Sequence, residues 1–172
     1  MSTFMTAPVP TKKMPGGIPY IIGNEAAERF SFYGMKGILV VFMTSFMFLM
    51  PGGAAEGMSD TEAIAYYHLF TTAVYFTPIL GALLSDILLG KYLTIMILSI
   101  VYCAGHGALA LMGTGGGIDP GWMLFLGLGL IAFGSGGIKP CVSAHVGDQF
   151  GSTNAHLLCK IFAWFYFSIN VG

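Results

Sequence analysis

Residues 18–50 read IPYIIGNEAAERFSFYGMKGILVVFMTSFMFLM, and this stretch decides the class of protein. A helix needs about 20 apolar residues to cross the hydrocarbon core of a bilayer. The run is purest from Phe30 onward. Pro51-Gly52-Gly53 then stops it, because Pro lacks a backbone N–H and Gly is a poor helix former. The sequence therefore predicts that this stretch forms a first membrane-spanning helix.

The composition of the whole chain supports a membrane protein. Of its 172 residues, 55% are hydrophobic and only 9% are charged, whereas a soluble domain carries about 25% charged residues. A net charge of −1 with seven scattered Lys and Arg provides no basic face, which excludes a nucleic-acid partner. The three cysteines lack metal-ligand spacing, and we find no nucleophile–base pair or phosphate loop. We therefore expect neither a metal site nor an enzyme.

Four stretches are long and apolar enough to cross a bilayer, and a fifth apolar run is cut short at Gly172. The predicted fold class is an all-α membrane protein with four complete transmembrane helices and the start of a fifth. Residues 1–17 are polar and rich in Pro and Gly, and they are predicted to be a short, disordered cytoplasmic leader. We interpret the chain as part of a longer protein, with residues 18–172 forming a partial N-terminal bundle. The predicted spans cover about residues 18–50, 63–85, 92–112, 122–146 and 157–172.

Two further signals concern the loops between the spans. Ser59 precedes Asp60 and Glu62, which predicts an N-cap followed by an acidic first turn. Residues 113–120 are predicted to form the loop before the fourth span. The basic residues of the loop regions all fall on one side of this multi-pass topology, and the positive-inside rule makes that side, with the N-terminus, cytoplasmic. These residues are Lys12, Lys13, Lys91 and Lys160.

The first span carries four charges, namely Glu25, Glu28, Arg29 and Lys36. An ionisable group inside a membrane costs several kcal/mol unless it is paired or hydrated, so each is a candidate functional residue. At 100° per residue, Glu25, Arg29 and Lys36 fall within about 60° of one another, with Glu28 beside them. Two acids and two bases on one face suit a carrier that exchanges protons and holds an anion. The alternative is a structural network of ion pairs.

The second and fourth spans carry further candidates. His68, Thr71, Thr72 and Tyr75 share one stripe, where His68 is either a hydrogen-bonded core residue or a proton carrier. Lys139 follows a glycine cluster at residues 134–137 and needs an acid partner, for which Glu25 or Glu28 is available. Alternatively, the side chain of Lys139 extends toward the membrane surface.

One further stretch and one histidine carry weaker signals. The stretch Gly81–Lys91 is predicted to bridge spans two and three as a loop in which Asp86 caps a tight turn and Lys91 forms an ion pair. The alternative is an ordinary loop. His106 lies between two glycines in the third span and is predicted to be a hydrogen-bonded packing residue.

Several of these motifs resemble one known family. Residues 24–36, NEAAERFSFYGMK, resemble the E-x-x-E-R-F motif of the proton-coupled oligopeptide transporters, which belong to the major facilitator superfamily. Residues 134–141 and 147–150 are similar to the fourth-helix signature of that family, and residues 167–172 to its fifth-helix segment. Residues 81–91 resemble the loop between helices two and three of the superfamily. The resemblance covers nearly the whole chain from Ile18 onward.

The resemblance implies proton-coupled symport of di- and tripeptides by alternating access, in a plasma (inner) membrane. It implies no cofactor, a proton gradient as the driving force, and a C-terminal bundle of the same protein as a partner. The implied proton-coupling residues are Glu25, Glu28, Lys139 and, as in some branches, His68. The implied substrate-binding residues are Arg29, Tyr33, Lys36, Tyr75, Lys139 and Asn170. The implied gating loop contains Gly81, Asp86, Gly90 and Lys91.

The chain departs from the family pattern at three positions. Phe32 stands where many members have Tyr, and Ile87 replaces a basic residue. Lys36 stands where Arg is common, so a bidentate grip on a carboxylate is lost. Two alternatives therefore stay open: a related carrier for another solute, such as nitrate or a drug-like compound, and a membrane sensor on the same fold that does not transport.

Overall fold

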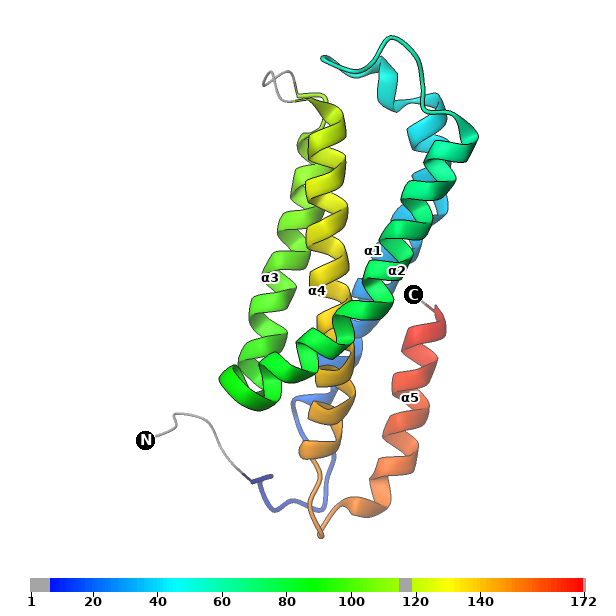
Figure 1. Cartoon of the computed structure of the whole chain (residues 1–172). Coiled ribbons are helices and arrows are strands. Elements are labelled where there is room, and N and C mark those ends of the chain that lie inside the picture. The colour runs from blue at the N-terminus through cyan, green and yellow to red at the C-terminus, as the bar shows by residue number, and fades with distance from the viewer. Residues whose placement is uncertain (1–6, 115–118, 172) are drawn as a thin grey trace. The chain divides into compact units, whose positions relative to one another are not determined.

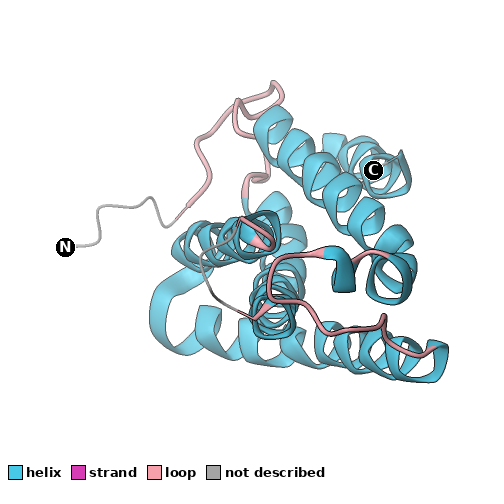
Figure 2. Ribbon diagram, turned by 90° about the horizontal axis from the view of Figure 1, so that it is seen from above, coloured by secondary structure: helices cyan, strands magenta, loops and turns pink. Residues whose placement is uncertain are grey.

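The computed structural model describes residues 7–114 and 119–171, and within these ranges the chain forms helices and turns but no strand (Figures 1 and 2). The all-α prediction is confirmed. Residues 1–6, residues 115–118 and Gly172 lie outside the described ranges, so parts of the predicted leader and of the predicted loop 113–120 are not described. The helices are α1 (Ile18–Ser45), η1 (Met47–Leu49), α2 (Asp60–Leu84), η2 (Ser85–Leu89), α3 (Gly90–Leu111), α4 (Pro120–Asp148), η3 (Ala155–Leu157) and α5 (Leu158–Val171).

The chain divides into two compact units, and α1 and α4 each contribute to both. The first unit, Gly34–Cys141, contains the second half of α1, all of α2 and α3, and most of α4. In this unit α2 and α3 fold back on each other through η2, a π-helical turn (Figure 1). The positive φ of Gly90, 74°, ends that turn. The core of this unit includes Leu39, Met43, Phe70, Val74, Leu98 and Ile131.

Small residues bring α2 and α4 into backbone contact. A Cβ placed on Gly81 would collide with the carbonyl oxygen of Gly137 and lie 2.5 Å from its Cα. One turn away, the Thr77 hydroxyl donates a 2.8 Å hydrogen bond to the carbonyl oxygen of Ala132. Close approach at small residues with a polar bond between helices is typical of packing inside membranes. The glycine cluster of the fourth span therefore has a direct packing role.

The other side of α4 packs equally closely against α3. A Cβ on Gly134 would lie 2.8 Å from the Cα of Tyr102. A Cβ on Gly105 would lie 2.9 Å from the carbonyl oxygen of Gly127. The glycines of α4 thus serve two neighbouring helices, which keeps this helix fixed within its unit.

The second unit contains the leader, the first half of α1, the end of α4, and α5. Residues 7–17 form no helix or strand, yet they contact the connection between α4 and α5. The Thr153 hydroxyl donates a 3.0 Å hydrogen bond to the carbonyl oxygen of Thr11, and Gly151 approaches the ring of Pro8. The described part of the leader is therefore held in place, which the prediction of disorder did not foresee. The core of this unit includes Ile18, Val146, Phe150, Ile161 and Phe165.

The ends of the helices test several local predictions. Ser59 caps α2, where its side chain accepts a 3.3 Å hydrogen bond from the backbone N–H of Glu62, as predicted. The predicted loop Gly81–Lys91 is wrong, because Gly81 is buried inside α2 and residues 85–89 stay helical. No helix-breaking residue follows Gly81 until Gly90, which explains the continuation. The predicted cap by Asp86 is also wrong, since the residue before η2 is Leu84 and no side chain caps the turn.

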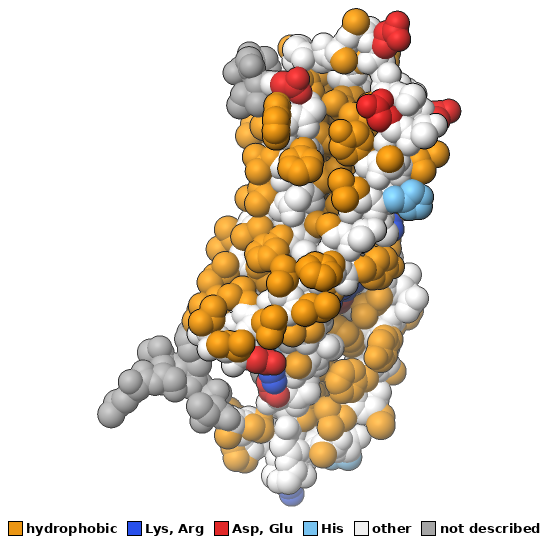
Figure 3. All heavy atoms as spheres, viewed as in Figure 1, with side chains coloured by type: hydrophobic (Ala, Val, Ile, Leu, Met, Phe, Trp, Pro, Cys, Tyr) orange, Lys and Arg blue, Asp and Glu red, His pale blue; other side chains and the backbone are white. Residues whose placement is uncertain are grey.

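Two helical stretches in the described residues are long and apolar enough to cross a membrane by length and composition. One is Asp60–Leu111, which contains α2, η2 and α3, and the other is Pro120–Asp148. Helix α1, which carries Glu25, Glu28, Arg29 and Lys36, is not among these stretches. Many large apolar side chains are exposed, and Figure 3 shows them covering much of the visible surface. A surface of this kind suits contact with lipid or with further helices.

Candidate functional site

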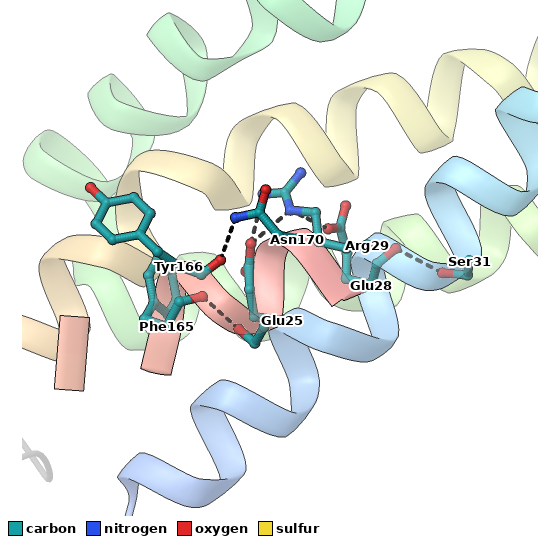
Figure 4. Close-up of polar contacts among 8 residues, drawn as sticks. Glu25, Glu28, Arg29, Ser31, Phe165, Tyr166 and Asn170 are labelled. Atoms are coloured by element: carbon teal, nitrogen blue, oxygen red, sulfur yellow. Dashed lines mark hydrogen bonds and ion pairs between the residues drawn. The ribbon is translucent and has the colours of Figure 1, made fainter. Parts of the chain in front are cut away.

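The first half of α1 holds a buried cluster of two acids and one base (Figure 4). The guanidinium of Arg29 lies 2.7 Å from Oε1 of Glu25 through Nη2, and its Nε donates to the same oxygen at 2.8 Å. Nε of Arg29 also lies 3.4 Å from Oε2 of Glu28. The exposed fractions are 3% for Glu25, 9% for Glu28 and 7% for Arg29. The spacing of four residues between Glu25 and Arg29 places them on one helix face, as predicted.

The formal charges of this cluster do not cancel. With both acids ionised, two carboxylates and one guanidinium carry a net charge of −1 in a buried environment. Burying a net charge is costly, so a proton on one acid or a further cation is expected to accompany these three groups. The cluster is thus chemically suited to exchange a proton for a cation.

Two predicted substrate residues lie in the same unit as this cluster. Tyr33 is half exposed and packs edge-on against Phe32, with the ring centroids 5.5 Å apart. Asn170 is exposed on α5, and its Nδ2 donates a 2.7 Å hydrogen bond to the carbonyl oxygen of Tyr166 in the same helix (Figure 4). The amide group of Asn170 is thereby held against its own helix.

The other predicted bases lie in the unit Gly34–Cys141, where α2 supports both of them. Nζ of Lys36 lies 5.1 Å from the ring centroid of Tyr67. Nζ of Lys139 lies 5.8 Å from the ring centroid of Tyr75. Both distances fall within the range of cation–π attraction, about 6 Å. The structure thus brings Lys139 to Tyr75, and the pairing of Lys139 with Glu25 or Glu28 stays a prediction.

The predicted histidines differ in their surroundings. His68 is exposed on α2 rather than buried in a core, and its ring packs edge-on to Tyr67, with the centroids 5.8 Å apart. His106 packs edge-on against Tyr102 at 4.7 Å. Among the described residues, its buried Nε2 finds no hydrogen-bond partner, so the prediction of a hydrogen-bonded packing residue is wrong for this atom.

The contact of Tyr67 with Lys36 was not anticipated from the sequence. Tyr67 and Tyr75 are eight residues apart, which places them about 80° apart around α2. That spacing was available as a signal, but the stripe assigned to α2 began at His68. The four residues predicted to act in gating lie in three elements: Gly81 inside α2, Asp86 exposed in η2, and Gly90 and Lys91 at the start of α3.

Comparison with known proteins shows what this chain is similar to. Residues 92–172 match the family model described as the POT family. The chain is similar to members of the POT family over most of its length. It is 42% identical over 163 residues to human solute carrier family 15 member 2, and 43% identical over 164 residues to peptide transporter family 1 of Drosophila melanogaster. Each match covers 92% of this chain but only 21% and 20% of the relative, so the chain spans about a fifth of their length.

Solved structures of POT transporters show the same fold. The POT family transporter PepTSo is 43% identical, with a TM-score of 0.77 over 92% of this chain and 30% of that one. A peptide transporter POT in complex with sulfate is 30% identical, with a TM-score of 0.81 over 96% and 32%. The POT family is a family of transporters, so the chain is an integral membrane protein with the fold of the major facilitator superfamily.

Proposed function

We propose that this chain supplies the N-terminal helical bundle of a proton-coupled symporter for di- and tripeptides. The observation that carries the proposal is the buried Glu25–Arg29–Glu28 cluster, with its formal charge of −1, in a chain similar to members of the POT family. The names of two similar proteins, peptide transporter family 1 of Drosophila melanogaster and of Caenorhabditis elegans, support the substrate class. A second, C-terminal bundle of the same protein would complete the carrier, and the two bundles would alternate access around a shared central site.

The proposed cycle uses the charge imbalance of the cluster. In the unprotonated state, Lys139 balances the acids Glu25 and Glu28. Protonation of an acid removes the need for that cation and frees Lys139 to hold the carboxylate of a peptide. Release of the proton and the peptide restores the ion pair. Each step stabilises one state of the carrier over the other, which is what a shift between outward-open and inward-open forms requires.

The remaining candidates complete the proposal. Arg29 and Lys36 would add positive charge at the peptide carboxylate, and the substrate would also contact Tyr33, Tyr75 and Asn170. His68, exposed on α2, would take part in proton transfer because an imidazole can both accept and donate a proton. The end of α2, the turn η2 and the start of α3 would act in gating through Gly81, Asp86, Gly90 and Lys91.

The proposed membrane placement follows from charge. The Lys residues of the leader and those at the starts of α3 and α5 favour a cytoplasmic N-terminus. We place the protein in the plasma (inner) membrane, where a proton gradient supplies the driving force and no cofactor is needed. The helical bundle would be embedded in the lipid bilayer, and the transported species would be the peptide and protons.

The test is uptake by the full-length protein in proteoliposomes. An inward proton gradient should drive accumulation of radiolabelled dialanine. Glu28→Gln and Lys139→Ala should each abolish gradient-driven uptake, because one removes a proton carrier and the other removes the balancing cation. Glu56→Gln is the matched control, since Glu56 is exposed in the connection between α1 and α2.

The same assay separates the alternatives. Unlabelled dialanine should compete with the label, whereas nitrate should not. Gradient-dependent uptake that persists at the wild-type rate in both variants would refute the mechanism. Competition by nitrate without competition by dialanine would refute the substrate class.

A further inference from the structure

The contact between α1 and α2 at Lys36 has no role in the mechanism above. Nζ of Lys36 lies 5.1 Å from the ring centroid of Tyr67, and both side chains are half-buried. Within the described ranges, no ion pair involves Lys36, so the tyrosine ring is its electrostatic partner there. Removed from water, such a contact is stronger than at a protein surface.

The chemistry of lysine explains why a ring is useful at this position. A Lys ammonium is a point charge on a flexible stem of four carbons, whereas an Arg guanidinium presents a rigid planar fork. A lysine that is to meet a carboxylate at one place must therefore be held by its surroundings. The face of Tyr67 attracts the ammonium without neutralising its charge, so the ammonium stays available to an anion.

The backbone around Tyr67 fixes the ring in turn. The Thr71 hydroxyl donates a 2.8 Å hydrogen bond to the carbonyl oxygen of Tyr67, and the neighbouring His68 packs edge-on at 5.8 Å. Eight residues further along α2, Tyr75 lies under Lys139 at 5.8 Å. One helix therefore supports cations from two others, about 12 Å apart along its axis.

We propose that Tyr67 is a positioning residue for peptide binding: its ring holds the Lys36 ammonium where the carboxylate of the substrate arrives. This inference rests on the proposed function, because it takes Lys36 as a carboxylate-binding residue. The inference also explains how a lysine can serve at position 36, where Arg is common in the family. The ring of Tyr67 supplies the orientation that the flexible lysine side chain lacks.

The first test is the affinity of the full-length protein for dialanine. Tyr67→Leu should raise KM by about 2- to 30-fold, the range that corresponds to one cation–π contact, with a smaller effect on the maximal rate. Tyr67→Phe, which keeps the ring, should restore most of the affinity. Tyr66→Leu is the matched control, because Tyr66 is the adjacent tyrosine of α2 and, among the described residues, holds no cation.

A double-mutant cycle separates positioning from general packing. In a Lys36→Met background, Tyr67→Leu should raise KM no further, because the cation it supports is gone. Inhibition of uptake by dialanine amide, which lacks the carboxylate, should be equally strong in Tyr67→Leu and in the wild type. A full effect of Tyr67→Leu in the Lys36→Met background, or an equal loss of affinity for the amide, would overturn the proposal.

A measurement without substrate separates this inference from the proposed function. Acetic anhydride labelling of Lys36, followed by mass spectrometry, should be faster in Tyr67→Leu than in the wild type or in Tyr67→Phe, because the ring covers one side of the amine. Equal labelling in all three proteins would overturn the contact itself. Faster labelling in a protein that imports no dialanine would instead refute the proposed function and leave the contact in place.

Discussion

The substitution Gly81→Ala tests the close contact between α2 and α4. The new Cβ would lie 2.5 Å from the Cα of Gly137, whereas carbon atoms in contact keep about 3.5–4.0 Å. The two backbones must therefore part by about 1 Å or more. Overpacking of this kind costs about 1–3 kcal/mol, and a weakened bond from Thr77 to Ala132 adds about 0.6 kcal/mol. Alanine returns up to about 1 kcal/mol as a better helix former, so we expect a net loss of roughly 1–3 kcal/mol.

The same substitution at another glycine should have the opposite effect on the free energy of unfolding. A Cβ on Gly107, four residues before the end of α3, meets no atom within 4 Å. Gly107→Ala should therefore leave stability unchanged or raise it by up to about 1 kcal/mol. The free energy of unfolding of the purified full-length protein, measured by SDS titration in mixed micelles, reports both changes.

A cysteine beside the contact reports locally on whether α2 and α4 have separated. Sγ of Cys141 is buried and lies 3.7 Å from the carbonyl oxygen of Gly81, while Cys103 and Cys159 are exposed. Separation of α2 from α4 should speed maleimide labelling of Cys141 in Gly81→Ala but not in Gly107→Ala. Equal unfolding energies and equal labelling rates in the two variants would refute the reasoning.

Three further substitutions test single interactions, each through the same unfolding titration. Arg29→Gln should cost about 3–5 kcal/mol because it leaves two buried carboxylates without their base, and adding Glu25→Gln should recover part of that loss; a loss below 1 kcal/mol would contradict the buried pairing. Thr77→Val should cost about 0.6 kcal/mol by removing the bond between helices, and a stabilised variant would speak against that bond. Ser59→Ala should cost about 1 kcal/mol by removing the cap of α2, and an unchanged energy would mean that the cap contributes nothing.

The sequence predicted those features that depend on near neighbours in the chain. The apolar runs located the helices, Ser59 was recognised as a cap, and the spacing of Glu25 and Arg29 placed them on one face. Each of these follows from a period or a pattern within a few residues. The helical continuation from residue 85 to residue 89 was missed because residues 81–91 were predicted to form a loop, although no helix breaker occurs between Gly81 and Gly90.

Contacts between distant parts of the chain could not be predicted from such local patterns. Nothing near Lys36 indicates that its partner is Tyr67, because the packing of α1 on α2 decides it. In the same way, Gly81 and Gly137 each look like ordinary helical glycines until the two helices meet. The charge cluster of α1 was predicted from local spacing, whereas the cation that balances it depends on tertiary structure and stays a prediction.

The bond from Thr153 to Thr11 joins residues separated by 142 positions in the chain. A ribosome that adds about 5–20 residues per second needs roughly 7 to 28 s to make that interval. The leader is synthesised first, yet its docking partner emerges only after four helices have been made. The contact between Thr11 and Thr153 is therefore among the last to form in the biogenesis of this part of the protein.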